Sequence, residues 1–328
     1  MRILVTGAAG MIGRKLTARL LGDGKVAGRA MTALDLHDIV PPETPAAPGV
    51  AVTAHTGDLG EPNAAAALVK AKPDVVFHLA GIVSGEAESN FDLGYRVNFD
   101  GTRALFDAIR LAGHGPRVVY TSSIAVFGAP FPDVIYDDFQ QTPLTSYGTQ
   151  KLVGELILAD YTRRGFFDGV GIRLPTICVR PGKANKAASS FFSGIIREPL
   201  AGVEAILPVP KSVVHTHASP RSAVNFLVHA AGLDGATIGP RRNITMPGVG
   251  VTVGEQIESL RRIAGADVVK LIKEVPDETI WKIVQNWPTR FDAKRAKALG
   301  FVAEENFDEI VRAHIEDEMQ NKAVGNRQ

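Results

Sequence analysis

The chain has 328 residues, of which 36 are Lys or Arg and 35 are Asp or Glu, so its formal net charge is only +1. With 45% hydrophobic residues, it has the composition of an ordinary soluble globular protein. The balanced charge argues against nucleic acid as a partner, and no run of about 20 apolar residues suggests insertion into a membrane. The single cysteine, Cys178, cannot form an internal disulfide, which favours a reducing, cytoplasmic location.

Short β-branched segments alternate with segments that carry apolar residues at helical spacing. The expected strands are residues 2–6, 32–35, 50–55, 75–80, 117–122 and 169–174. The expected helices are residues 11–21, 63–71, 93–112 and 147–164, followed in the second half by 219–231, 253–264, 277–285 and 292–299. This alternation predicts an α/β fold with a Rossmann-type, doubly wound parallel sheet.

The first strand leads into a glycine-rich turn, GxxGxxG, formed by Gly7, Gly10 and Gly13, and then into a helix. Glycines allow a tight turn whose backbone N–H groups approach a pyrophosphate, and the helix N-terminus adds the positive end of its dipole. Because the motif lies between a strand and a helix, it predicts a dinucleotide site. Met11 and Ile12 belong to the same predicted cofactor contacts.

The ends of the next three strands supply further predicted contacts with the dinucleotide. Asp35 is expected to end the second strand, where a carboxylate accepts hydrogen bonds from the ribose hydroxyls and repels a 2′-phosphate. NAD is therefore favoured, while Arg14 and Arg29 leave NADP as an alternative. The third and fourth strands end at residues expected to close over the adenine and the ribose, namely Asp58, Leu59, Leu79, Ala80 and Gly81.

A candidate catalytic set follows the fifth strand. Tyr147 and Lys151 are four residues apart on an expected helix and so share one face. A phenol is a poor base at neutral pH, but a neighbouring ammonium group lowers its pKa, so Tyr147 is predicted to act as a general base or acid. Ser123, at the carboxyl end of the fifth strand, places a hydroxyl where it can hold the reacting oxygen.

Taken together, these motifs resemble those of the extended short-chain dehydrogenase/reductases, a superfamily that includes nucleotide-sugar epimerases and dehydratases. The resemblance spans nearly the whole chain and rests on the glycine turn, Asp35, Asp58-Leu59, the HLAG of residues 78–81, Asn98, the SSIAVFG of residues 122–128, Tyr147, Lys151 and the FDAKRAKALGF of residues 291–301. It implies NAD as the cofactor, with Asn98 and Ser122 among the residues that bind it, and Ser123, Tyr147 and Lys151 as the catalytic set.

The character of the sequence changes near Pro175, after which proline and glycine separate shorter elements. We expect residues 1–174, completed by residues 212–245, to form the NAD-binding domain. Residues 175–211 and 246–328 are expected to form a smaller substrate-binding domain at the carboxyl ends of the strands, where open α/β sheets bind ligands.

Nucleotide-sugar members of the superfamily commonly carry an Arg-Asp-Phe run and an acidic pair, and the corresponding residues 212–221, SVVHTHASPR, lack both. Residues 174–200, the HTHASPRSAV from residue 215 and the RRNITMPG from residue 241 instead resemble a narrower group, the D-erythronate dehydrogenases. This implies NAD-dependent oxidation at C2 of a four-carbon sugar acid, D-erythronate, to 2-dehydro-D-erythronate. The substrate contacts are then expected from Ser84, Ser123, Thr176, Arg180, Lys183, Asn185 and His217.

In this mechanism, Tyr147 takes the proton of the C2 hydroxyl, Ser123 fixes the substrate oxygen, and Lys151 lowers the pKa of Tyr147 and holds the nicotinamide ribose. A nucleotide-sugar epimerase or dehydratase would use the same three residues and stays an alternative. A non-catalytic NAD sensor is disfavoured because it would not need all three. The histidines near residue 215 have no third ligand at metal spacing, so no metal site is predicted. The resemblance also implies a homodimer, formed through helices 93–112 and 147–164.

Overall fold

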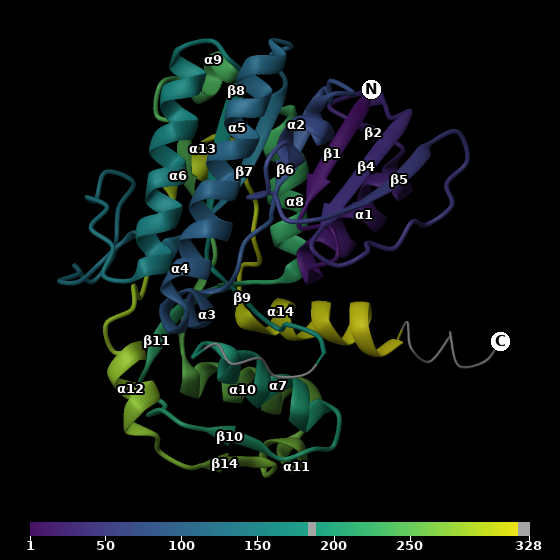
Figure 1. Cartoon of the computed structure of the whole chain (residues 1–328). Coiled ribbons are helices and arrows are strands. Elements are labelled where there is room, and N and C mark those ends of the chain that lie inside the picture. The colour runs from purple at the N-terminus through teal and green to yellow at the C-terminus, as the bar shows by residue number, and fades with distance from the viewer. Residues whose placement is uncertain (183–187, 321–328) are drawn as a thin grey trace.

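A seven-stranded parallel sheet forms the larger lobe in the computed structural model, which describes residues 1–182 and 188–320 (Figure 1). Its strand order is β12-β8-β7-β6-β1-β4-β5. The strands are β1 (Arg2–Thr6), β4 (Ala33–Asp38), β5 (Ala51–Thr56), β6 (Val75–His78), β7 (Arg117–Ser123), β8 (Asp168–Leu174) and β12 (Asn243–Thr245). The predicted α/β fold with a doubly wound parallel sheet is confirmed.

Helices cover both faces of this sheet because successive strand residues point to opposite sides. Ile3 and Val5 of β1 pack with α1 (Met11–Asp23) and α8 (Pro220–Gly232), whereas Leu4 packs with the helices of the other face. Those helices are α2 (Ala64–Val69), α5 (Gly101–Ala112) and α6 (Ser146–Arg163). The sheet is therefore the middle of three layers.

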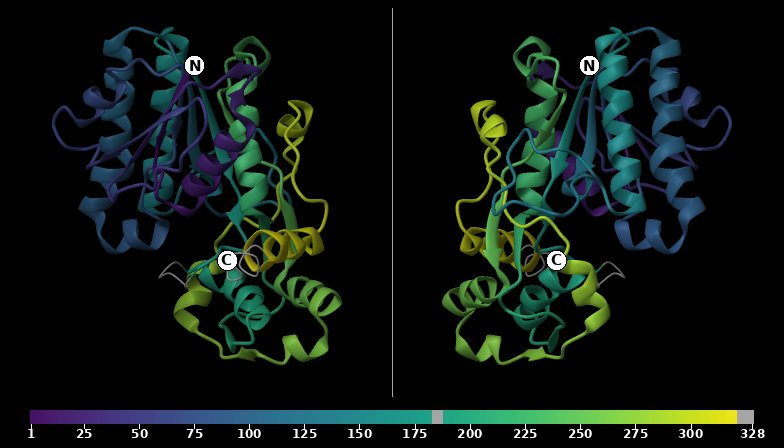
Figure 2. Two further views of the ribbon diagram at one scale, coloured as in Figure 1. Left: turned by 90° about the vertical axis from the view of Figure 1, so that its right-hand side faces the viewer. Right: turned by 90° about the vertical axis from the view of Figure 1, so that its left-hand side faces the viewer.

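The smaller lobe has its own apolar core and lies beyond the carboxyl ends of the strands (Figure 2). Its elements are α7 (Ser190–Leu200), α10 (Val253–Ala264), α11 (Ala266–Val269), α12 (Glu278–Val284), α14 (Phe307–His314) and the two-stranded sheet β10 (Ala205–Leu207)–β14 (Ile272–Glu274). A three-stranded sheet, β13 (Val249–Thr252)–β11 (Val214–Ala218)–β9 (Thr176–Ile177), joins this core to the larger lobe.

The remaining elements are short. They are β2 (Lys25–Val26), β3 (Arg29–Ala30), α3 (Ser84–Ser89), α4 (Phe91–Gly94), the π-helix η1 (Tyr95–Asp100), the 3₁₀ helix η2 (Ile124–Val126), α9 (Gly235–Ile238), α13 (Lys294–Ala298) and the π-helix η3 (Ile315–Gln320). The single helix expected at residues 93–112 is thus divided among α4, η1 and α5. In the described part of the chain, no helix is both long and apolar enough to cross a bilayer.

Candidate active site

The glycine-rich turn packs directly against the end of a neighbouring strand. Gly7 has a φ of +75°, and a Cβ at this residue would lie 2.6 Å from the backbone N of Ala80. A Cβ on Gly13 would lie 2.1 Å from the carbonyl oxygen of Gly7. Only glycine fits both positions, and helix α1 begins at Met11 directly after the turn. With Met11 and Ile12 partly exposed in its first turn, this arrangement fits a pyrophosphate.

The acidic residue at the end of β4 is not the one that the sequence suggested. Strand β4 continues to Asp38, so Asp35 lies within the strand. Asp35 is buried, and its two carboxylate oxygens accept hydrogen bonds from Arg2 at 2.7 Å and from His55 at 3.2 Å. Asp38 lies beside the glycine turn, where its Oδ2 accepts a hydrogen bond from the N–H of Ala9 at 2.9 Å. The prediction that Asp35 ends this strand is therefore wrong, while its contact with the dinucleotide stays untested.

The two arginines that left NADP as an alternative have other partners. Arg29 forms an ion pair with Asp74 at 2.7 Å. Arg14 donates to the carbonyl oxygen of Ala9. Neither observation adds support for a 2′-phosphate site.

The ends of the next two strands are shaped by local contacts. Asp58 accepts a hydrogen bond from the N–H of Gly60 at 2.8 Å and lies 3.4 Å from Arg96. The side chain of Leu59 is buried in the core with α2 and α5, so its backbone alone remains to meet a ligand. Leu79 and Ala80 are partly exposed after β6.

Asn98 is completely buried on η1 and holds the loop that follows β6. Its Oδ1 accepts from the N–H of Ile82 at 2.8 Å, and its amide donates to Ile82 O at 3.2 Å and to Gln150 Oε1 at 2.8 Å. A Cβ on Gly81 would lie 2.9 Å from Asn98 Oδ1 and 3.4 Å from Lys151 Nζ. Asn98 therefore holds this loop over the catalytic lysine. Both amide hydrogens of Asn98 are donated to protein oxygens, so its side-chain amide has no hydrogen left to donate to a cofactor. Sequence reasoning missed Gln150, although it stands inside the YGTQK motif.

The three predicted catalytic residues come together where β7 ends and α6 begins. Tyr147 and Ser123 share a side-chain hydrogen bond. The Nζ of Lys151 lies 5.8 Å from the centre of the Tyr147 ring and donates to the carbonyl oxygen of Thr121 at 2.9 Å. Helix α6 is capped by Thr145, whose side chain accepts from the N–H of Gly148 at 3.0 Å.

Burial dominates the electrostatics of this site. It raises the pKa of Tyr147, while the hydrogen bond from Ser123 and the positive charge of Arg180 oppose the rise. Burial also lowers the pKa of Lys151 to about 8, and Glu155 opposes this fall. Arg180 is thus a cation that opposes the rise in the pKa of Tyr147, and the expected contribution of Lys151 stays a prediction.

Ser122 does not face the cofactor side with Ser123. Its hydroxyl donates to Glu155 Oε1 at 2.5 Å, and Glu155 forms a buried ion pair with Arg173 at 2.7 Å. Neighbouring side chains on a strand point to opposite faces, so Ser122 and Ser123 cannot serve one ligand in the same way. The Ser122 hydroxyl is thus engaged by Glu155, and a contact between Ser122 and the cofactor stays a prediction for its backbone.

Arg180 is the predicted substrate residue whose charge reaches the catalytic tyrosine. Its guanidinium group donates to Ser189 Oγ at 2.8 Å, and its backbone N–H donates to Ser193 Oγ at 3.0 Å. Among residues 1–182 and 188–320, no carboxylate forms an ion pair with it. Ser84 is partly exposed at the start of α3, while Lys183 and Asn185 lie outside the described residues.

Two histidines of β11 form the middle of an aromatic cluster. Since His215 Nδ1 lies 2.9 Å from the carbonyl of Pro288, this nitrogen donates, and Nε2 accepts from the hydroxyl of Thr176 at 2.7 Å. His217 is completely buried, 4.8 Å from the ring of Phe192, and its Nε2 lies 2.7 Å from Gln256 Nε2. His217 is thus closed off from solvent and its contact with the substrate stays a prediction, whereas Thr176 is partly exposed. In the part of the chain that the structure describes, no three His, Cys, Asp or Glu side chains are grouped as metal ligands require.

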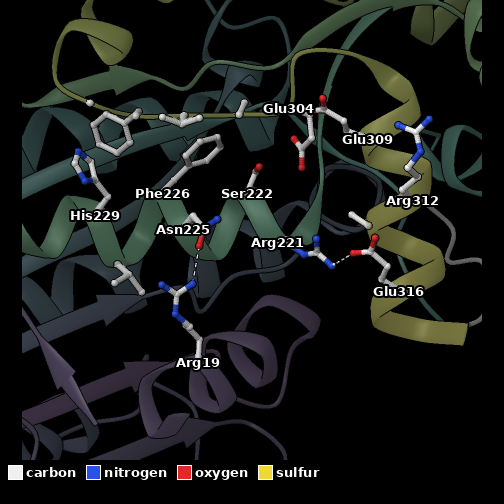
Figure 3. A pocket seen from close by; sticks show the side chains of 16 residues that line it. Arg19, Arg221, Ser222, Asn225, Phe226, His229, Glu304, Glu309, Arg312 and Glu316 are labelled. Atoms are coloured by element: carbon white, nitrogen blue, oxygen red, sulfur yellow. Dashed lines mark hydrogen bonds and ion pairs between the residues drawn. The ribbon is translucent and has the colours of Figure 1, made fainter. Parts of the chain in front are cut away.

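A separate cavity of about 620 Å³ lies between α8 and the C-terminal segment (Figure 3). It contains none of the predicted site residues. Its arginines have partners, because Arg19 donates to Asn225 at 2.7 Å and Arg221 donates to Glu316 at 2.9 Å and to Asp317 at 2.6 Å. The cavity is therefore distinct from the catalytic cluster.

Comparison with known proteins agrees with this geometry. Residues 3–215 match the family model described as the NAD dependent epimerase/dehydratase family. The chain is 47% identical over 321 residues to a D-erythronate dehydrogenase of Cupriavidus necator, covering 97% of this chain and 98% of that protein. It is 39% identical over 319 residues to a D-erythronate dehydrogenase of Haemophilus influenzae, covering 97% of this chain and 100% of that protein.

The solved structures include a close match. A crystal structure described as the nucleoside-diphosphate-sugar epimerase from Agrobacterium tumefaciens superimposes with a TM-score of 0.96 at 60% identity, covering 98% of this chain and 95% of that one. Family model, full-length relatives and site geometry agree on the cofactor and on the class of chemistry. The chain therefore belongs to the NAD dependent epimerase/dehydratase family, in the extended short-chain dehydrogenase/reductase superfamily, and is an NAD-dependent oxidoreductase.

Proposed function

We propose that this enzyme oxidises the C2 hydroxyl of a small sugar acid, and that D-erythronate, converted to 2-dehydro-D-erythronate, is its substrate. The observation that carries the proposal is Arg180, a largely buried cation that has no carboxylate partner among the described residues and whose charge acts on Tyr147. An arginine fork binds a carboxylate with two parallel hydrogen bonds. A substrate carboxylate held there would lie near the catalytic phenol. The two relatives named D-erythronate dehydrogenase support this choice of acid.

In this mechanism the chain binds, orients and moves a proton. Tyr147 Oη accepts the proton of the C2 hydroxyl. Ser123, which is hydrogen-bonded to Tyr147, would hold the oxygen of that C2 hydroxyl in place. Lys151, held by the carbonyl of Thr121, holds the nicotinamide ribose. NAD, when bound, supplies the acceptor for the two electrons and the hydrogen that leave C2.

The cofactor would be held along the carboxyl ends of β1, β4, β5 and β6, the first four strands of the sheet in chain order. We propose contacts from Gly7, Gly10, Met11, Ile12, Gly13, Asp58, the backbone of Leu59, Leu79, Ala80 and Gly81, with Asp38 in place of Asp35 on the ribose hydroxyls. Thr176, whose hydroxyl donates to His215, would offer its remaining lone pairs to a substrate hydroxyl, and Ser84 would lie near it.

Nucleotide-sugar epimerisation is the second candidate, because the Agrobacterium tumefaciens relative carries that description and the catalytic set would be the same. Against it stands the segment 212–221, in which a diphosphate would need a free arginine. Its arginine, Arg221, is already paired with Glu316 and Asp317, and His215 and His217 are buried. A sensor that only binds NAD would leave Ser123, Tyr147 and Lys151 without a purpose.

The test is to mix the purified protein with NAD and D-erythronate, with other C4 to C6 sugar acids and with UDP-sugars, and to follow NADH formation. We expect rapid NADH formation with D-erythronate. Interconversion of a UDP-sugar without net NADH formation would replace this proposal with the epimerase.

We further propose a homodimer, acting in the cytoplasm, that is formed through α5 and α6. These helices run side by side on one face of the sheet, and Leu111 and Leu156 on them are 75% and 61% exposed. Light scattering on the wild type and on Leu156→Arg would test this interface, since a charge in the pair of helices should yield monomers.

A further inference from the structure

A buried ion pair lies behind the catalytic lysine. Tyr147, Lys151 and Glu155 are spaced four residues apart on α6 and so share one face of that helix. Glu155 is only 1% exposed, and its partner Arg173 on β8 is 6% exposed. This pair belongs to none of the contacts assigned above to NAD or substrate.

The carboxylate of Glu155 is bound by donors on two strands. Arg173 Nε lies 2.9 and 3.2 Å from its two oxygens, and Arg173 Nη2 lies 2.7 Å from Oε2. The hydroxyl of Ser122 donates to Oε1 at 2.5 Å. A buried ion pair is retained without a large cost only when such hydrogen bonds satisfy it, and this one is satisfied from both sides. The carboxylate of Glu155 is therefore held in one position by Ser122 and Arg173.

Other titratable groups around Lys151 come from several elements. His78 on β6 has its pKa lowered to about 3 by burial, and burial raises the pKa of Tyr120 on β7, so both are neutral at neutral pH. Tyr147 precedes Lys151 on α6 and also has a raised pKa. Arg173 on β8 is paired with Glu155. Among the described residues, Glu155 is the anion whose charge acts on Lys151.

We propose that Glu155 is a positioning residue for the reaction, whose carboxylate, fixed by Ser122 and Arg173, keeps Lys151 a cation beside Tyr147. This inference rests on the role proposed for Lys151 above. Burial favours loss of the lysine proton, and an anion that faces the ammonium group opposes that loss. The hydroxyl of Ser122 thereby contributes to catalysis through two other side chains, without touching NAD.

The test compares Glu155→Gln with the wild type across pH. The amide keeps the shape of the carboxylate and can still accept from Ser122, but it removes the charge. Lys151 should then lose its proton at a lower pH than in the wild type. We expect the ratio of kcat/KM in E155Q to that in the wild type to fall about tenfold or more between pH 6 and pH 9. A ratio that stays constant with pH would overturn the proposal, whatever the absolute activity.

Two further variants separate this effect from a loss of folding. Asp168→Asn makes the same change in another arginine pair, with Arg117 and Arg242 at the start of β8, and should leave the pH profile unchanged. The double variant E155Q/R173Q removes both charges of the buried pair, so it leaves no unpaired buried arginine to destabilise the folded state. Its ratio should also fall with pH, less steeply than that of E155Q.

The same variants distinguish this inference from the proposed function. If the wild type oxidises no sugar acid, the proposed function fails, and the affinity for NADH measured by fluorescence across pH replaces kcat/KM as the readout. Lys151→Met gives the reference for a site without the cation. The NADH affinity of E155Q should approach that of K151M at high pH and that of the wild type at low pH. If the NADH affinities of E155Q and the wild type depend equally on pH, the role of Glu155 is refuted.

Discussion

The catalytic cluster of Ser123, Tyr147 and Lys151 and the histidine cluster of His215 and His217 are both polar, and the sequence predicts a ligand contact for the catalytic set and for His217. They differ in how their polar atoms are used. His215 has a partner on each ring nitrogen and stacks 5.1 Å from Phe192, whereas Lys151 has one carbonyl acceptor among the described residues for its three hydrogens. His217 lies between these cases, because its Nε2 meets Gln256 while its buried Nδ1 has no partner among the described residues. Polar groups left incompletely satisfied are the ones suited to a ligand.

The largest expected effect comes from Tyr147→Phe, which removes the proton acceptor and little else. General acid–base catalysis contributes about 10²- to 10⁴-fold, so kcat should fall by that factor. Binding of NADH, measured by fluorescence, should stay within about threefold, since a single hydrogen bond is at stake. Turnover comparable to that of the wild type would show that the catalytic cluster does not carry the chemistry.

Arg180→Gln should have the next largest effect, because it removes the cation proposed to hold the substrate carboxylate. A hydrogen bond to a charged group contributes about 1.5–3 kcal/mol, which corresponds to roughly a 10- to 100-fold loss of kcat/KM for the sugar acid. Steady-state kinetics would measure it, with Arg221→Gln as the control. Arg221 pairs with Glu316 and Asp317 near the C-terminus, so R221Q should leave kcat/KM unchanged.

A smaller effect should distinguish the two acidic residues of β4. Asp38→Asn should weaken NAD binding about tenfold and reduce the discrimination against NADP, because the charge that faces the ribose is lost. Asp35→Asn should leave the NAD to NADP preference unchanged and instead lower the melting temperature, since Asp35 binds Arg2 and His55. The opposite pattern would restore Asp35 as the ribose ligand.

The histidine cluster should affect stability rather than turnover. Burial lowers the pKa of His215 to about 4, so the folded state keeps it neutral while the unfolded chain binds a proton below about pH 6.5. Stability from this residue is complete above pH 6.5 and is lost as the pH falls towards 4, by up to about 1.4 kcal/mol per pH unit.

Urea unfolding at pH 7.5, 6.5 and 5.5 would measure how the free energy of unfolding changes with pH. In His215→Asn this change should be smaller, by the amount that corresponds to about one fewer proton taken up on unfolding. Activity of the folded variant at pH 7.5 should change by less than about fivefold. A loss of activity in His215→Asn as large as that in Tyr147→Phe would assign His215 to the catalytic cluster, and the histidine cluster would then not be purely structural.

Much of the larger lobe could be predicted from the sequence because its strands are long, apolar and regularly spaced. Strand β1 was placed to the residue, and β7 and β8 to within one residue at either end. Strands β9, β11, β12 and β13 were missed, since segments of two to five residues between proline and glycine carry little periodicity. Helix α7, which contains Gly194 and Pro199, was missed because both residues argue against a helix.

The site was predictable where local spacing determines geometry and not where tertiary register does. The four-residue spacing of Tyr147 and Lys151 fixes their shared face on a helix. Asp35 was chosen over Asp38 because the end of a strand cannot be located to within three residues from its pattern alone. The opposite directions of Ser122 and Ser123, and the burial of His217, depend on how strands pack in three dimensions.

The pairing of β12 with β8 has a consequence for synthesis on the ribosome. Strand β8 ends at Leu174, but its outer neighbour begins at Asn243, so about 70 residues must be translated before this edge of the sheet is covered. At about 5–20 residues per second, the nascent chain presents an open strand edge for several seconds. Unpaired edges attract other chains, so recognition by a chaperone would be most valuable to this protein in that interval.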